Sequence, residues 1–326
     1  MPHDSLRSEP AAGEPQWERA ALEKIALASL QEQRRSRRWG IFFKLLGFIY
    51  LFALLFVALG WLGKRDGVSP VRHTALVEIN GVIGADLPGA AENITAGLQE
   101  AFKDKATQGV VLRINSPGGS PVQAAQINDE IRRLREKYPD TPLYAVVEDI
   151  CASGGYYVAV ASDKIFVNES SIVGSIGVLM DGFGFSSVLD KLGIERRLLT
   201  AGENKGFLDP FSPLEPAQKA HAQKMLDAIH QQFIKVVREG RGDRLKETPD
   251  TFTGLMWTGE ESIEMGLADA LGSVEYVARE VIKAEEMVDF TPRENIAERV
   301  AKRFGAAMAE ALVRAGMMAS DRVMLR

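Results

Sequence analysis

Hydrophobic residues follow three patterns along the chain, and the first is one long apolar run. Residues 41–62 read IFFKLLGFIYLFALLFVALGWL and contain a single charge, Lys44. At about 1.5 Å rise per residue, a helix of this length crosses a hydrocarbon core about 30 Å thick. A cleaved signal peptide and a buried core helix are the alternatives. A signal peptide, however, has a shorter apolar region and a shorter segment before that region. The pattern predicts an uncleaved transmembrane helix.

The charges on the two sides of this run predict its orientation. Four arginines precede it in the sequence RRSRRW, residues 34–39, whereas the far side has a sparser set: Lys64, Arg65 and Arg72, with Asp66 between them. Basic residues are retained on the cytoplasmic side. We therefore expect a single-pass protein with residues 1–40 in the cytoplasm, partly disordered, and everything after a tether at 63–72 exported.

The second pattern is an alternation of apolar strand-like runs with amphipathic helix-like runs. Near-continuous apolar runs such as GVVLRINS are typical of strands that are covered on both faces. Alternating strands and helices predict an α/β fold with a mainly parallel sheet. The expected strands are residues 74–81, 109–116, 142–150 and 164–169, and the expected helices are residues 95–106, 120–139 and 154–162.

Beyond residue 213 the third pattern is helical. Apolar residues three and four positions apart predict a helix over residues 213–241, and residues 295–319 are also amphipathic. Packing of the last segment on the domain or on a neighbouring subunit is the simpler interpretation of its apolar face.

Composition narrows the possible chemistry. The 326 residues carry a formal net charge of −5, which gives no reason to expect nucleic acid as a partner. Cys151 is the single cysteine, so no internal disulfide forms, and four scattered histidines without a Cys/His cluster argue against a zinc site. We expect neither a metal nor a cofactor.

Three glycine-rich turns stand at the ends of predicted strands: NSPGGS at 115–120, ASGGYY at 152–157 and VGSIGV at 173–178. Ligands of parallel α/β sheets bind at the carboxyl ends of the strands, so these turns are expected to meet. None has the spacing of a phosphate-binding loop. Each turn alone is weak evidence for a site.

Ser153 lies between Ala152 and two glycines, where a strand is expected to end and a helix to begin. As a nucleophile it would use the N–H groups of Gly154 and Gly119 as an oxyanion hole. As a helix N-cap it would contribute about 1 kcal/mol to helix stability. Local sequence favours the cap, and a nucleophile needs an activating base.

Lys205, in the loop LLTAGENKGFLDPFSP, is the candidate base, because no histidine stands in a motif-like setting. A lysine acts as a base only when neutral, which requires burial that lowers its pKa. Ser175 in GSIG is a candidate to orient the amine. A solvated loop lysine is the alternative for Lys205, and it is the interpretation that we favour for Lys164.

Together these motifs resemble the signal peptide peptidase A family of membrane-anchored bacterial serine peptidases, in its short form with one copy of the domain. The matching stretches run in the family's order through most of residues 75–275: LRINSPGGS, ASGGYYVAVASDKIF, IVGSIGV, LDKLGIE, AGENKGFLDPFSPL and TGEESIEMGLADALGS. The sequence GEN before Lys205 and the cysteine at 151 depart from the expected pattern. The first departure affects the loop of the base, and the second places a thiol near the nucleophile.

The resemblance implies a Clp-protease/crotonase-like fold over residues 73–284, followed by a helical extension at 285–326. It implies Ser153 as nucleophile, Lys205 as general base, Gly119 and Gly154 as the oxyanion hole and Ser175 as the residue that orients the lysine. It also implies location in the bacterial inner membrane with the peptidase domain exported, cleavage of remnant signal peptides, and assembly into a homo-oligomeric ring.

Two other functions fit parts of the sequence. A crotonase-type enzyme acting on acyl-CoA would share the fold, but an exported domain lacks that cofactor and Lys205 would have no task. A non-catalytic membrane scaffold would assemble through its helices, and failure to react with serine-directed reagents would favour it.

Overall fold

The computed structural model describes residues 17–58 and 71–292 of the chain. The described residues divide into two units, one within Met1–Gly67 and one within Val68–Arg293. The expected helix at 295–319 and most of the tether at 63–72 lie outside the described residues.

In the first unit, the described residues form one helix of 42 residues, α1 (Trp17–Ala58). One stretch of it, Arg35–Leu55, is long and apolar enough to cross a membrane, and none of that stretch is buried. The helix-like segment before the apolar run and the run itself are thus continuous. The end of the expected span, residues 59–62, lies outside the described residues.

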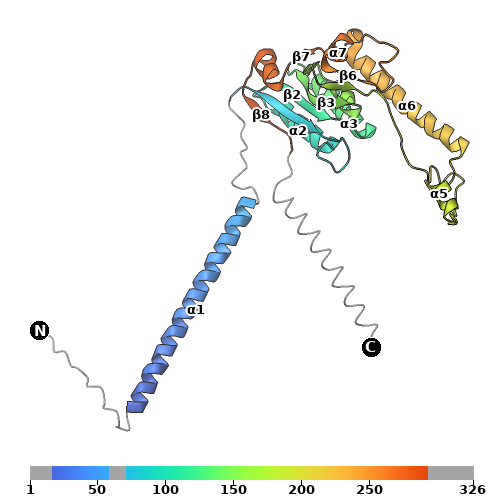
Figure 1. The fold of residues 1–326 in the computed structure, drawn as a ribbon. Helices are drawn as coiled ribbons and strands as arrows, with labels where there is room; N and C mark the ends of the chain where they lie inside the picture. Colours follow the sequence, from blue (N-terminus) through green and yellow to red (C-terminus); the bar gives the residue numbers. More distant parts are fainter. Residues whose placement is uncertain (1–16, 59–70, 293–326) are drawn as a thin grey trace. The chain divides into compact units, whose positions relative to one another are not determined.

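The second unit is built on an eight-stranded sheet with the order β6-β5-β3-β2-β1-β8, in which β4 and β7 branch from β3 (Figure 1). All strand pairs are parallel except β5 with β6, which confirms the mainly parallel sheet. In chain order the elements are β1 (His73–Asn80), α2 (Ala91–Lys103), β2 (Thr107–Ser116), α3 (Pro121–Lys137), β3 (Leu143–Ala152), α4 (Gly154–Ala159), β4 (Lys164–Val167), β5 (Ile172–Gly174), α5 (Ser186–Lys191), α6 (Pro216–Arg241), η1 (Gly242–Arg244), β6 (Met256–Thr258), α7 (Gly259–Glu264), β7 (Ala270–Leu271), α8 (Val274–Tyr276), η2 (Val277–Ile282) and β8 (Met287–Asp289).

Alternate residues of the central strands supply two hydrophobic cores. The larger core lies under α2, α3 and α4, and it includes Leu112, Ile114 and Val147 of the sheet together with residues of those helices such as Ile127. The smaller core lies on the opposite face under α8 and η2, and it includes Val111 and Val146 with residues of those two helices. β2 is therefore covered on both faces, as its unbroken apolar run predicts.

After residue 213 the described structure differs from the sequence-based expectation. α6 is the expected helix, but it is followed by three short strands, β6, β7 and β8, which complete the sheet. Strands of two or three residues contain too few positions to show an alternating pattern. A detectable signal was present for α7, because Thr258 and Glu261 form a capping box at its start.

β3 contains a bulge that redirects its last residues. Ile114 of β2 pairs with Val147, and the next pair is Ser116 with Cys151, so β3 advances four residues (147 to 151) while β2 advances two (114 to 116). The buried Ser171 repairs the interrupted ladder by donating its hydroxyl to the Glu148 carbonyl at 2.5 Å. Past the bulge, β3 pairs with β5 instead of β4. The bulge therefore sets the direction in which the chain enters Ser153.

A buried ion pair joins the end of α6 to the sheet. The Arg241 side chain is 1% exposed and contacts the Asp269 carboxylate through two nitrogens, at 2.8 and 3.0 Å. Asp269 also accepts the Ile165 backbone N–H at 2.7 Å. Burial acts to raise the pKa of Asp269, but the bonds from Arg241 and Ile165 outweigh it, so the pKa lies below its usual value.

We expect Asp269→Asn to lower the free energy of unfolding by about 3 kcal/mol, because it leaves the Arg241 charge buried without an opposite charge. Glu247→Gln is the matched control, since Glu247 forms a similar two-nitrogen contact with Arg238 on the exposed side of α6. Urea unfolding at neutral pH measures both. Because the pKa of Asp269 is depressed, the difference should be present above about pH 4 and shrink as the pH falls further. Equal losses in the two variants would contradict this assignment.

Candidate active site

The three glycine-rich turns meet at the carboxyl ends of β2, β3 and β5, as expected. Residues 117–120 follow β2, Ser153 follows β3, and Ser175 follows β5. The Ser153 N–H donates to the Gly174 carbonyl at 2.8 Å, which joins the second turn to the third. The parallel register therefore gathers segments that are far apart in sequence at one edge of the sheet.

Ser153 has a strained backbone at the junction of β3 and α4. Its φ is 53° and its ψ is −122°, a conformation that residues with a β-carbon rarely adopt. Strain of this kind costs on the order of 1–3 kcal/mol and concentrates at functional sites. The side chain is half-buried and makes no capping hydrogen bond to α4. The N-cap role that local sequence favoured is therefore absent in the described structure.

The first glycine turn lies directly against Ser153. A β-carbon on Gly118 would lie 2.7 Å from the Ser153 β-carbon and 2.6 Å from the Gly154 nitrogen. Gly118 has φ +100°, so a side chain there would be both strained and in collision with the nucleophile candidate. Glycine at 118 is required by this close approach.

The backbone around Gly119 directs its own N–H toward Gly154. Ile83 forms a parallel bridge with Gly119 by donating its N–H to the Gly118 carbonyl and accepting the Ser120 N–H, each at 2.8 Å. In such a bridge the N–H of the bridged residue, here Gly119, points away from Ile83. On that side, a β-carbon on Gly154 would lie 3.2 Å from the Gly119 nitrogen. Neither the Gly119 nor the Gly154 N–H has a hydrogen-bond acceptor among the described residues.

Ser175 belongs to the same cluster. It also has a positive φ, 52°, and its N–H donates to the Leu255 carbonyl at 2.7 Å. The preceding residue, Gly174, accepts the Ser153 N–H through its carbonyl. Ser175 is therefore next in sequence to a residue that contacts the nucleophile candidate directly. The structure thus brings Ser153, Gly119, Gly154 and Ser175 together.

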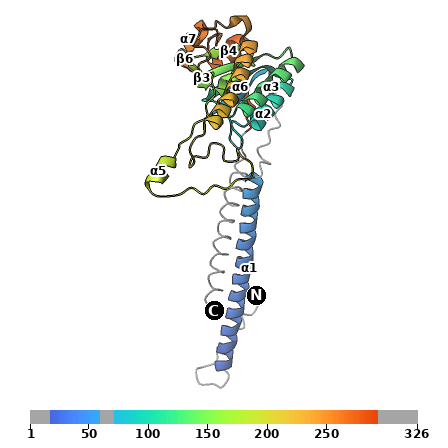
Figure 2. The same cartoon turned by 90° about the vertical axis from the view of Figure 1, so that its right-hand side faces the viewer.

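Lys205 is not part of this cluster in the described structure. It lies in an arm, residues 179–215, that includes α5 and extends away from the sheet in both views (Figures 1 and 2). Among the described residues, the arm contacts itself and the start of α6: Phe185 N–H donates to the Pro210 carbonyl at 2.7 Å, and Leu208 N–H to the Gln218 side chain at 3.3 Å. Lys205 itself is exposed.

The arm is unusually apolar for an exposed segment. Leu199 is 97% exposed and Leu179 is 81% exposed, and Phe183 and Leu192 are exposed as well. Exposed apolar surface of this extent marks a surface that contacts another molecule or another part of the chain.

Cys151, two residues before Ser153, is buried in the larger core with no exposed area. Burial raises the pKa of its thiol far above the usual value. The thiolate is the reactive form of cysteine, so Cys151 is inert at neutral pH. The thiol lies near the nucleophile candidate in sequence but does not compete with it.

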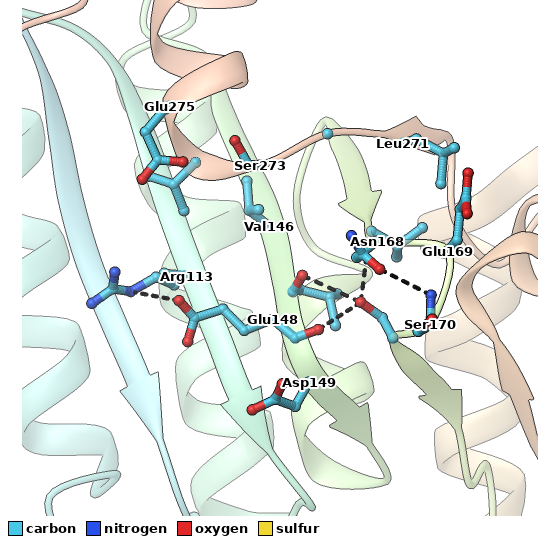
Figure 3. Close-up of a pocket in the computed structure, with 15 residues that line it drawn as sticks. Arg113, Val146, Glu148, Asp149, Asn168, Glu169, Ser170, Leu271, Ser273 and Glu275 are labelled. Atoms are coloured by element: carbon cyan, nitrogen blue, oxygen red, sulfur yellow. Dashed lines mark hydrogen bonds and ion pairs between the residues drawn. The ribbon is translucent and has the colours of Figure 1, made fainter.

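A separate hollow of about 820 Å³ lies at the β3 bulge, lined by polar and apolar residues of β2, β3, the β4–β5 loop and residues 271–275 (Figure 3). In it Arg113 contacts Glu148 at 3.4 Å, and the Ser170 N–H donates to the Asn168 side chain at 3.0 Å. None of the expected site residues lines it. The candidate active site is therefore the cluster of turns, and this hollow lies outside it.

Sequence reasoning missed two contributors to the site. Ile83 anchors the turn at Gly118 and Gly119, and the β3 bulge aims Ser153. The glycine that ends the first strand, Gly81, marked the turn that leads to Ile83. No local pattern marked the bulge, because it depends on pairing with two different strands.

Comparison with known proteins adds a family assignment to this geometry. The family model described as Peptidase family S49 matches residues 135–288. The chain is 32% identical over 201 residues to a putative signal peptide peptidase SppA of Enterococcus faecium, covering 61% of this chain and 58% of that protein. It is 30% identical over 207 residues to a putative protease of Synechocystis, covering 64% of this chain and 72% of that protein.

A further relative carries a different name. A Na(+)/H(+) antiporter NhaA of Brucella melitensis is 48% identical over 182 residues, which are 55% of this chain and 24% of the antiporter. The chain thus spans about a quarter of the Brucella protein and a little over half of the Enterococcus protein.

The burial of Cys151 leads to a direct prediction. In the folded full-length protein, N-ethylmaleimide should leave the Cys151 thiol unmodified over hours, and modification should reach one thiol per chain in urea, as measured by mass spectrometry. The control is Leu199→Cys, which places a second thiol at an exposed position of the arm and should react within minutes under native conditions. Rapid native modification of the wild type would show that Cys151 is accessible.

Proposed function

The chain belongs to peptidase family S49, and on that premise we propose that it is a membrane-anchored serine endopeptidase in which Ser153 is the nucleophile and Lys205 the general base. Its α/β fold with a mainly parallel sheet is the Clp-protease/crotonase-like architecture. The observation that carries the proposal is the strained Ser153, beside which two backbone N–H groups have no acceptor in the described part of the chain.

The chemistry follows from these groups. The Ser153 oxygen attacks the carbonyl carbon of the scissile peptide bond while the neutral Lys205 amine takes the hydroxyl proton. The N–H groups of Gly119 and Gly154 stabilise the oxyanion that forms. The lysine then returns the proton to the leaving amine, which leaves an acyl group on Ser153. Water, deprotonated by the same lysine, releases the acyl group and restores the enzyme.

Lys205 must move into the site for this reaction. Base catalysis by a lysine needs an amine shielded from water, whereas Lys205 is exposed on the arm. Either the arm folds back onto its own sheet, or the arm of a second copy supplies the lysine. The exposed apolar residues of the arm support a contact of one of these kinds. Assembly into a homo-oligomer, the ring that the family resemblance implies, would provide the second route.

The substrate class and location belong to the same proposal. The apolar stretch of α1 supports anchoring in the inner membrane, with the basic residues before it in the cytoplasm and the peptidase domain exported. Substrates are then apolar peptides close to the bilayer, such as the remnants of cleaved signal peptides. The name of the Enterococcus relative, a putative signal peptide peptidase, is consistent with this class.

Reaction with a fluorophosphonate tests the dyad. We expect Ser153→Ala to lose labelling completely and to lose at least about a thousandfold in peptide turnover, because the nucleophile is removed. Lys205→Ala should show a comparable loss of turnover. Cys151→Ala is the control and should keep wild-type labelling and wild-type peptide turnover. Wild-type labelling in Ser153→Ala would reject Ser153 as the nucleophile, whereas failure of the wild type to be labelled would favour the non-catalytic scaffold.

A mixing experiment distinguishes the two routes for the base. Ser153→Ala and Lys205→Ala chains are each expected to be inactive alone, so activity in the mixture would require a site with Ser153 from one copy and Lys205 from another. If the arm supplies Lys205 to a neighbouring copy, the co-expressed variants should recover about a quarter of wild-type turnover. In a random 1:1 ring, about one site in four combines an intact Ser153 with an intact Lys205. The double variant Ser153→Ala/Lys205→Ala mixed with wild type is the control for dilution. No recovery in co-assembled chains would place both residues in one copy.

A further inference from the structure

α6 contacts both walls of the candidate site. On one side, Phe233 of α6 packs against Tyr157 of α4, with ring centroids 5.1 Å apart. The Tyr157 N–H in turn donates to the Ser153 carbonyl at 2.9 Å. The packing of α6 on α4 therefore supports the short helix whose first residue follows the nucleophile.

On the other side, His230 lies one turn before Phe233 and reaches the segment that follows β5. Its Nε2 is 3.1 Å from the Ile176 carbonyl oxygen. A carbonyl oxygen can only accept, so Nε2 carries the proton and donates. In the described part of the chain, this is the single hydrogen bond between α6 and residues 175–178.

The segment held by His230 is strained and central to the site. Ser175 has a positive φ and precedes Ile176, whose side chain is fully buried. The Gly177 N–H donates to the Ser175 carbonyl at 2.9 Å, which closes a tight turn. The arm begins two residues later, at 179. The Ile176 carbonyl is thus the point where α6 fixes both Ser175 and the base of the arm that carries Lys205.

We propose that His230 is a positioning residue of the peptidase site, which acts by donating a hydrogen bond from Nε2 to the Ile176 carbonyl and thereby holds Ser175 and the base of the arm in register with Ser153. This inference rests on the proposed function. His230 touches neither substrate nor the reacting atoms, and its effect passes through residues 175–177.

The test uses the full-length chain in detergent and three variants. His230→Leu removes the donor and retains an apolar side chain. His230→Gln keeps an N–H donor at a similar distance from the helix. Gln231→Leu changes the exposed neighbour on the same turn and serves as the control. Peptide turnover gives kcat and KM, and thermal unfolding gives Tm.

We expect His230→Leu to lower kcat about tenfold with KM within about twofold of wild type, as one lost hydrogen bond predicts for a group that orders the site. His230→Gln should restore kcat to within about threefold of wild type, and Gln231→Leu should not change it. Tm should be similar in all the variants. If His230→Leu does not fold, His230→Asn replaces it, because its shorter amide falls short of the carbonyl.

Three results would overturn the inference. Wild-type kcat in His230→Leu would show that the bond has no role in the reaction. Equal loss in His230→Leu and His230→Gln, with a lower Tm in both, would show that His230 only packs the helix. In either case an inactive Ser153→Ala variant would leave the proposed function intact. Full turnover by Ser153→Ala would reject the proposed function itself, and the role of His230 with it.

Discussion

The site depends on a close approach between two backbone segments. Gly118 and Gly119 lie so near Ser153 and Gly154 that a β-carbon at 118 would collide with both. The bridge to Ile83 fixes this turn on one side, and the hydrogen bond from Ser153 to Gly174 fixes Ser153 on the other. The N–H groups of Gly119 and Gly154, which have no acceptor among the described residues, therefore owe their positions to the backbone. Gly118 is essential because any other residue would place a β-carbon in this contact.

Much of this arrangement follows from local sequence. The strands through residue 167 and the helices between them are confirmed because long apolar runs and clear periodicity specify them. The glycine turns are confirmed as neighbours because parallel strands end at one edge. The bulge in β3 and the strands β6, β7 and β8 were not predictable, since they depend on partners distant in sequence and contain few residues.

The arm marks the limit of sequence reasoning about the site. The motif around Lys205 indicated a base, yet motif order carries no information about which surface the loop meets. Its exposed leucines and phenylalanines are typical of a surface that contacts another molecule or another part of the chain. By contrast, the contact between His230 and Ile176 joins residues 54 positions apart and was detectable only in three dimensions.

The backbone strain at Ser153 lowers the stability of the fold whether or not the hydroxyl is present. A positive φ is costly because of the β-carbon, which serine and alanine share. Replacing the hydroxyl with hydrogen would therefore remove the candidate nucleophile while leaving the backbone penalty unchanged, and only glycine at this position would relieve it. The chain thus carries at this position a cost in stability that persists without the hydroxyl, and backbone strain of this kind is concentrated at functional sites.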